Sequence, residues 1–223
     1  MNAHHEHEFE AAPGLPEPLP RGERLLWQGS PDFRTLAIHA FHVRKLALYF
    51  AAMLGLQWLY LLGEPNAALL RPLLTSAGMA LLALALLTTI AWFAARTTLY
   101  TLTDRRIVMR IGIVLTLTFN LPLRQVAGAA LKPQAAGHGD IALTLAGKDR
   151  IAWLNLWPHA RPWQLKNPQP SLRCLPEAAT VGARIQQAWS ALHPDANAVL
   201  GDAIPTSEPA RAPRERGIPT VAA

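Results

Sequence analysis

Two apolar stretches decide the fold: LALYFAAMLGLQWLYLL at residues 46–62 and LLTSAGMALLALALLTTIAWFAA at residues 73–95. Neither contains Lys, Arg, Asp, Glu or His. A helix needs roughly 20 apolar residues to cross a hydrocarbon core, which the second stretch supplies. The first stretch is marginal alone, but Gly63 and interfacial residues at both ends can extend it. Buried helices of soluble proteins usually carry a polar stripe, and these stretches have none. The sequence therefore predicts a hairpin of two transmembrane helices, at about residues 46–63 and 73–95.

Basic residues flank this hairpin on the sides away from its short connector. They are Arg34, Arg44 and Lys45 before the first stretch, and Arg96, Arg105 and Arg106 after the second. The positive-inside rule places such flanks in the cytoplasm, so we expect both termini there and the connector outside. The chain has a net charge of +6, which favours contact with anionic lipid headgroups. Arg44, Lys45, Arg105 and Arg106 are the candidate lipid-facing residues, and no nucleic-acid recognition motif accompanies them.

The segments before the first stretch differ in character. Residues 1–31 are acidic and proline-rich, which forbids a regular helix and predicts an extended N-terminal tail. Residues 32–45 mix apolar and basic side chains at helical spacing. We expect them to form a juxtamembrane helix that runs into the first span, so that residues 32–96 make one membrane unit.

After Arg96 the apolar pattern changes from helical to alternating. It predicts strands at residues 97–103, 106–111, 113–119, 124–132, 141–145, 150–157 and 171–175, separated by turn signals. Residues 177–192 then carry one apolar stripe at helical spacing, which includes Trp189. Residues 97–193 should thus form a cytoplasmic β-sandwich or barrel capped by a C-terminal helix, and residues 194–223 a disordered tail.

This plan resembles a pleckstrin-homology (PH)-like domain. Tyr-Thr-Leu-Thr-Asp-Arg-Arg-Ile at residues 100–107, followed by Arg-Ile-Gly at residues 110–112, resembles the opening hairpin of bacterial membrane-anchored PH domains. Gly-Asp-Ile at residues 139–141 also matches that pattern. In those families the domain directly follows a transmembrane hairpin, and the same order is expected here.

A second resemblance covers nearly the whole chain. The segments HEHEFE (residues 5–10), PGLP (13–16), GERLLWQGSPD (22–32), HAFHVRK (39–45) and LWPHARPW (156–163) resemble the PuhB family of photosynthetic-complex assembly proteins of purple bacteria. The resemblance implies a factor of the inner (intracytoplasmic) membrane that helps assemble the reaction centre and its core light-harvesting complex. Its partners would be subunits of those complexes and membrane lipids, and a homo-oligomer is compatible with the same sequence.

No catalytic constellation is found, so we do not expect an enzyme. The sequence lacks a phosphate-binding Gly-rich loop with Lys, a His-Glu-x-x-His motif and a nucleophile elbow. His4, His5 and His7 could bind a metal, but a solvated tail or docking peptide is the favoured interpretation, since ordering the tail costs entropy. His39 and His42 could ligate the magnesium of bacteriochlorophyll, although interfacial polar groups are favoured. No cofactor and no metal is therefore expected.

Tryptophans near a proline-rich connector give the strongest binding signal. Trp153 suits a core position on a strand, whereas Trp157, His159, Arg161 and Trp163 lie among prolines. Trp and Arg are enriched in binding hot spots, so these four residues form the candidate partner-binding surface. Two functions stay open: an assembly factor that binds photosynthetic subunits, and a membrane-anchored PH module that binds anionic lipid or an unrelated membrane protein.

Overall fold

A computed structural model describes residues 15, 18–63, 70–113, 115–147 and 151–194. The first four elements in chain order are β1 (Leu25–Gly29), α1 (Phe33–His39), α2 (Val43–Leu62) and α3 (Leu70–Thr97). The domain continues with β2 (Leu99–Thr103), β3 (Arg106–Ile111), β4 (Leu117–Pro122), η1 (Leu123–Gln125), β5 (Val126–Pro133), η2 (Ala135–Gly137) and β6 (Gly139–Leu145). It ends with α4 (Trp153–Leu156), β7 (Ser171–Leu175) and α5 (Ala178–Leu192).

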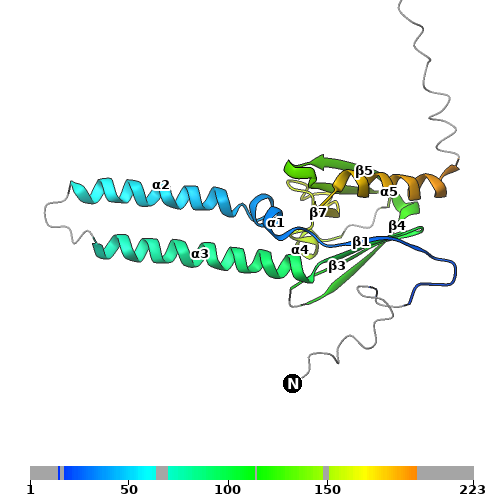
Figure 1. Ribbon diagram of the computed structural model, residues 1–223, viewed down its shortest axis with the longest axis horizontal. Coiled ribbons are helices and arrows are strands. Elements are labelled where there is room, and N and C mark those ends of the chain that lie inside the picture. The colour runs from blue at the N-terminus through cyan, green and yellow to red at the C-terminus, as the bar shows by residue number, and fades with distance from the viewer. Residues whose placement is uncertain (1–14, 16–17, 64–69, 114, 148–150, 195–223) are drawn as a thin grey trace, which may run out of the picture.

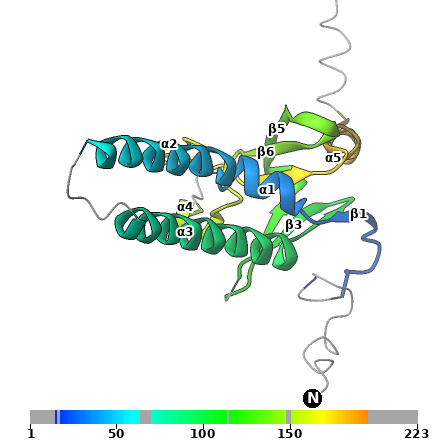
Figure 2. The same cartoon turned by 60° about the vertical axis from the view of Figure 1, so that its left-hand side comes forward.

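The two apolar stretches form the helices α2 and α3, which lie side by side and project from one end of a β-domain (Figures 1 and 2). They are antiparallel, and the Gln57 side chain donates a hydrogen bond to the Pro72 carbonyl at 3.3 Å. No residue of α2 is buried, so much of its apolar surface is left uncovered by the described part of the chain. Both helices are long and apolar enough to cross a membrane. Most of the connector between them lies outside the described residues.

The domain is a sandwich of two antiparallel sheets, with α5 packed against it. One sheet has the order β1-β2-β3-β4 and the other the order β5-β6-β7. Between them lies a core of fully buried side chains, among them Tyr100, Leu102, Ile107, Met109, Leu143 and Leu172. Val181, Ile185 and Ala188 face this core from α5. The Trp189 indole packs against it and donates a hydrogen bond to the Val126 carbonyl at 2.8 Å. The predicted sandwich with a C-terminal helix is confirmed.

The first strand comes from before the helical hairpin, where the sequence predicted an extended tail. β1 pairs with β2, with Gln28 opposite Thr101 and Gly29 opposite Tyr100. The prediction of a tail over residues 1–31 is thus wrong for 25–29, while residues 1–14, 16 and 17 lie outside the described ones. The stretch Leu-Leu-Trp-Gln-Gly has strand-forming side chains, but its pairing partner lies seventy residues later, beyond the reach of local patterns.

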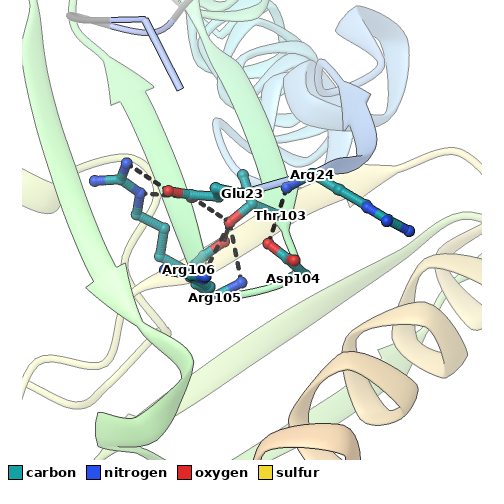
Figure 3. Close-up of polar contacts among 6 residues, drawn as sticks. All are labelled: Glu23, Arg24, Thr103, Asp104, Arg105 and Arg106. Atoms are coloured by element: carbon teal, nitrogen blue, oxygen red, sulfur yellow. Dashed lines mark hydrogen bonds and ion pairs between the residues drawn. The ribbon is translucent and has the colours of Figure 1, made fainter. Parts of the chain in front are cut away.

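Glu23 fastens the chain just before β1 to the turn between β2 and β3 (Figure 3). Its carboxylate accepts two hydrogen bonds from the Arg106 guanidinium, each 2.8 Å long, and one from the Thr103 hydroxyl at 2.7 Å. The Arg24 backbone N–H donates to the Asp104 carboxylate at 3.0 Å. Burial alone would raise the pKa of Glu23, but the hydrogen bonds from Arg106 and Thr103 outweigh it and lower that pKa. We call Glu23, Thr103 and Arg106 the strand latch.

The juxtamembrane segment is a separate helix and does not run into α2 as predicted. α1 starts at Asp32, whose carboxylate caps it by accepting from the Thr35 N–H at 2.8 Å. The chain then bends, and His42 adopts a left-handed backbone with a φ of 54° before α2 begins. Leu36, Ala37 and Phe41 are buried against the end of α3 and Cys174. This packing explains the bend, because a continuous helix would carry these apolar side chains away from α3.

Two predicted strands differ from the structure. The strand predicted at residues 150–157 is not found in the described residues 151–157, where α4 covers 153–156; residues 148–150 lie outside the described part. Trp153 and Leu156 both pack on the core, and their spacing of three residues suits one helical turn rather than alternation. The third strand runs over 117–122 instead of 113–119, because the chain turns at Gly112, with φ at 128°, and pairs again only from Leu117.

Candidate functional site

A cleft of about 790 Å³ opens where the helical hairpin meets the domain. It is lined by the bend between α1 and α2, the end of the β5–β6 hairpin and the proline-rich loop that follows α4, together with Trp153 of α4 and Arg173 of β7. Its lining includes His39, His42, Lys45, Lys132, Trp157, Trp163 and Arg173. We call this the junction cleft. It brings together candidates that are more than a hundred residues apart in the sequence.

Two tryptophans on the proline-rich loop give the cleft its apolar surface. Trp157 is 46% exposed and packs edge-on against Phe41, with ring centroids 5.4 Å apart. Trp163 is 95% exposed and has a φ of 65°. A left-handed backbone is unfavourable for a bulky residue, and such positions cluster at functional sites. The loop therefore presents one large ring to the surroundings and anchors the other at the bend between α1 and α2.

The polar lining of the cleft is predominantly basic. Lys45 and Lys132 lie on it from opposite sides, and Arg173 forms part of it. The Arg173 Nε lies 3.3 Å from the Asp140 carboxylate, in an ion pair whose two side chains are each 8% exposed. The Arg173 guanidinium also donates to the carbonyls of Pro158, at 3.3 Å, and His39, at 3.4 Å. Arg173 thus ties the proline-rich loop to the end of α1, while the lysines supply net positive charge.

His159 fixes the proline-rich loop to the sandwich and is buried, contrary to its place in the predicted surface. It is 1% exposed. Its Nδ1 lies 2.6 Å from the Tyr100 hydroxyl and its Nε2 lies 2.9 Å from the Thr98 hydroxyl. The Tyr100 hydroxyl also accepts a hydrogen bond from the Arg173 backbone N–H at 3.2 Å. Burial, and then the nearby Arg173 charge, lowers the pKa of His159 to about 3, so the ring is neutral at physiological pH.

The other predicted surface residues are placed as follows. Arg161 is exposed beside the cleft and donates to the Gln169 side chain at 2.9 Å. Trp153, predicted as a core residue, packs against the core. His39 and His42 both line the cleft, but they do not lie on one juxtamembrane helix, because His39 ends α1 and His42 precedes α2.

The candidate lipid-facing residues divide into two groups. Arg44 and Lys45 are exposed in the first turn of α2. Arg105 and Arg106 lie at the tip of the β2–β3 hairpin, at the opposite end of β2 from α3 (Figure 3). A strand of this length spans about 17 Å. The expectation that this tip lies next to the helices is therefore wrong, and Arg106 is engaged in the strand latch.

Sequence reasoning missed Lys132, Asp140 and Arg173 as parts of the site. In the sequence, Asp140 stood out only as part of the Gly-Asp-Ile match. Lys132 was the last residue of one predicted strand, and Arg173 lay within another. In the described part of the chain no group of three or more His, Cys, Asp or Glu side chains could hold a metal ion. His4, His5 and His7 lie outside that part. The arrangement suits binding by aromatic and cationic side chains.

Comparisons with known proteins agree with this architecture. The profile of the family described as "Bacterial PH domain" matches residues 46–189, which include both apolar helices and most of the sandwich. A protein of Rhodobacter capsulatus, described as "Uncharacterized 23.7 kDa protein in puhA 5'region", is 38% identical over 195 residues. That match covers 84% of this chain and 89% of the relative. No solved structure matches significantly. PH domains are typically interaction modules without catalytic activity, and by its profile match this chain belongs to the bacterial PH domain family.

Proposed function

We propose that the protein is a membrane-anchored, non-enzymatic assembly factor for the photosynthetic reaction centre and its core light-harvesting complex. It holds newly inserted subunits of those complexes at the junction cleft. The helices α2 and α3 cross the inner membrane, and the domain stands on its cytoplasmic side. The photosynthetic assignment is supported by the relative whose description places it in the 5' region of puhA, a photosynthesis gene.

The observation that carries the binding role is the exposed Trp163 on the rim of a basic, aromatic cleft at the base of the two helices. Contiguous exposed apolar side chains often mark interaction sites, and Trp157, Trp163 and Leu165 are all exposed on this loop. Trp and Arg are also enriched in binding hot spots. The loop that carries Trp163 is held by His159 and Arg173, so little conformational entropy is lost when a partner binds. A subunit emerging from the membrane beside α2 would meet this surface directly.

Replacement of Trp163 by Ala tests the proposal. We expect the tagged variant, purified from membranes that are making photosystems, to capture reaction-centre and antenna subunits about thirtyfold more weakly, corresponding to about 2 kcal/mol. The matched control is Gln187→Ala, an exposed position on α5. Both variants should reach wild-type levels in the membrane. Equal capture by wild type and Trp163→Ala would refute the role of the cleft, and normal complex accumulation in a gene deletion would refute the assembly function.

A second function, recognition of anionic lipid, is favoured by Lys45 and Lys132 on the same cleft. Lipids retained by the purified protein, identified by mass spectrometry, separate the two functions. Retention of anionic lipid without pigment-protein subunits, lost when Lys45 and Lys132 are both replaced by Gln, would support the lipid module. Co-purification of subunits that persists in that double variant would support the assembly factor.

The membrane arrangement has its own test. Reporter fusions after Asn66 and after Leu192 should show the connector in the periplasm and the C-terminal side of α5 in the cytoplasm. A periplasmic signal from the second fusion would contradict the orientation. Arg44 and Lys45 in the first turn of α2 support it, since basic residues at that end favour the cytoplasmic side.

A further inference from the structure

α3 extends beyond α2 at the end that faces the domain. The hydrogen bond from Gln57 to Pro72 sets the alignment of the two antiparallel helices. Counting from this pair, the start of α2 at Val43 lies about level with Leu86 of α3. The remaining turns of α3, up to Thr97, reach about 16 Å further. Lys45, in the first turn of α2, marks the level at which the proposed membrane interior ends.

One side of this extension is covered by protein and another is not. Ala91, Ala94 and Ala95 are buried against α1. Trp92 and Phe93, in contrast, are 41% and 43% exposed. Trp92 lies about 9 Å beyond Leu86 along the helix, at the depth of the headgroup layer, where aromatic side chains are enriched.

The connection between β3 and β4 exposes further apolar side chains at the same end of the domain. Leu99, the first residue of β2 after α3, pairs with Arg110 near the end of β3. The end of β3 therefore lies beside the point where the chain passes from α3 into β2. In both views the connection lies next to the last turns of α3 (Figures 1 and 2). Ile113, Leu115 and Leu117 are 39%, 79% and 40% exposed. A connection between strands normally places polar side chains in water.

We propose that the β3–β4 connection enters the headgroup region of the bilayer and forms a third membrane contact beside the two helices. This inference rests on the transmembrane arrangement proposed above. Lipid is the fitting occupant because the exposed side chains continue the apolar surface of α3 past the end of α2. The guanidinium of Arg96, stacked 5.0 Å from the Trp92 ring, provides a cation at the level of the lipid phosphates. The contact holds the domain, and with it the junction cleft, at a fixed tilt to the membrane.

Fluorescence quenching in lipid nanodiscs tests this contact with the full-length protein. A nitrobenzoxadiazole label is attached to each of three variants: Leu115→Cys, Leu82→Cys and Gln187→Cys. Leu82 is exposed on α3 and reports the proposed span, and Gln187 is exposed on α5 and reports water. Cys174 is buried, and burial, followed by the Asp140 charge, raises its thiol pKa to about 12, so it stays unlabelled. Nanodiscs contain phosphatidylcholine and phosphatidylglycerol, with nitroxide-bearing lipid as one quencher and aqueous iodide as the other.

We expect the label at position 115 to be quenched by shallow lipid nitroxide and to be at least threefold less sensitive to iodide than the label at 187. Iodide quenching at 115 equal to that at 187 would overturn the inference. Protection at 115 from both quenchers would also overturn it, because protein would then cover the loop. If position 82 is quenched by lipid nitroxide while 115 is not, only the loop contact fails. If neither is quenched, the transmembrane arrangement itself fails.

Discussion

Acidification from pH 7 to pH 5 should destabilise the domain through protonation of His159 in the unfolded chain. The buried ring stays neutral in the folded protein, since its pKa is lowered to about 3, whereas in the unfolded chain it takes up a proton near pH 6.5. A group whose folded pKa is lowered contributes a free energy of unfolding that decreases as the pH falls below the unfolded pKa. The loss is about 1.4 kcal/mol per pH unit well below 6.5, which gives about 2 kcal/mol between pH 7 and pH 5.

Urea denaturation of the detergent-solubilised protein, followed by near-ultraviolet circular dichroism at both pH values, measures this loss. The matched variant is His159→Gln, which keeps polar atoms near Thr98 and Tyr100 but cannot be protonated. It should be less stable than the wild type at pH 7 and should lose little further stability by pH 5. The pKa values of Glu23 and Asp32 are lowered from already acidic values, so these carboxylates remain ionised over this range. An equal pH dependence in wild type and His159→Gln would refute the reasoning.

Two further predictions concern the stability of the domain. Trp189→Ala should lower the free energy of unfolding by about 3 kcal/mol, and Trp189→Phe by about 1 kcal/mol, because Phe keeps an aromatic ring against the core and loses the hydrogen bond to Val126 and part of the indole. Equal losses in urea denaturation would mean that the ring does not dock. In the strand latch, Glu23→Gln should cost about 2 kcal/mol, and the same change in an Arg106→Gln background should cost much less. Additive effects in that double-mutant cycle would contradict the latch.

Local patterns predicted the elements whose partners are close in sequence. The apolar helices, the β2–β3 hairpin and the C-terminal helix α5, which carries Trp189, were all predicted from the sequence. What sequence reasoning missed depends on distant contacts. β1 forms a strand only because β2 offers it an edge, and residues 153–156 turn into a helix because the core receives two of their side chains three residues apart. Local propensity does not report such tertiary partners.

The same distinction applies to the site. Trp157 and Trp163 were predicted as a binding surface from residue type, and the structure places both on the junction cleft. His159, in the middle of that segment, points inward, because its two ring nitrogens find hydroxyl partners on the chain that leaves α3. Lys132 and Arg173 reach the cleft only through the pairing of β5, β6 and β7. Whether a polar residue faces in or out at such a place is decided by partners that the sequence does not identify.

In the membrane arrangement proposed above, the position of β1 before the helical hairpin links membrane insertion to completion of the domain. β1 and β2 are neighbours in one sheet, yet the whole hairpin is synthesised between them. During synthesis the first strand must wait until both apolar helices have emerged, and the sheet can close only if the two ends of the hairpin return to the same side of the membrane. A chain whose second helix failed to insert would keep β1 and β2 on opposite sides. In that arrangement, the sandwich can be completed only in chains in which both helices of the hairpin were inserted.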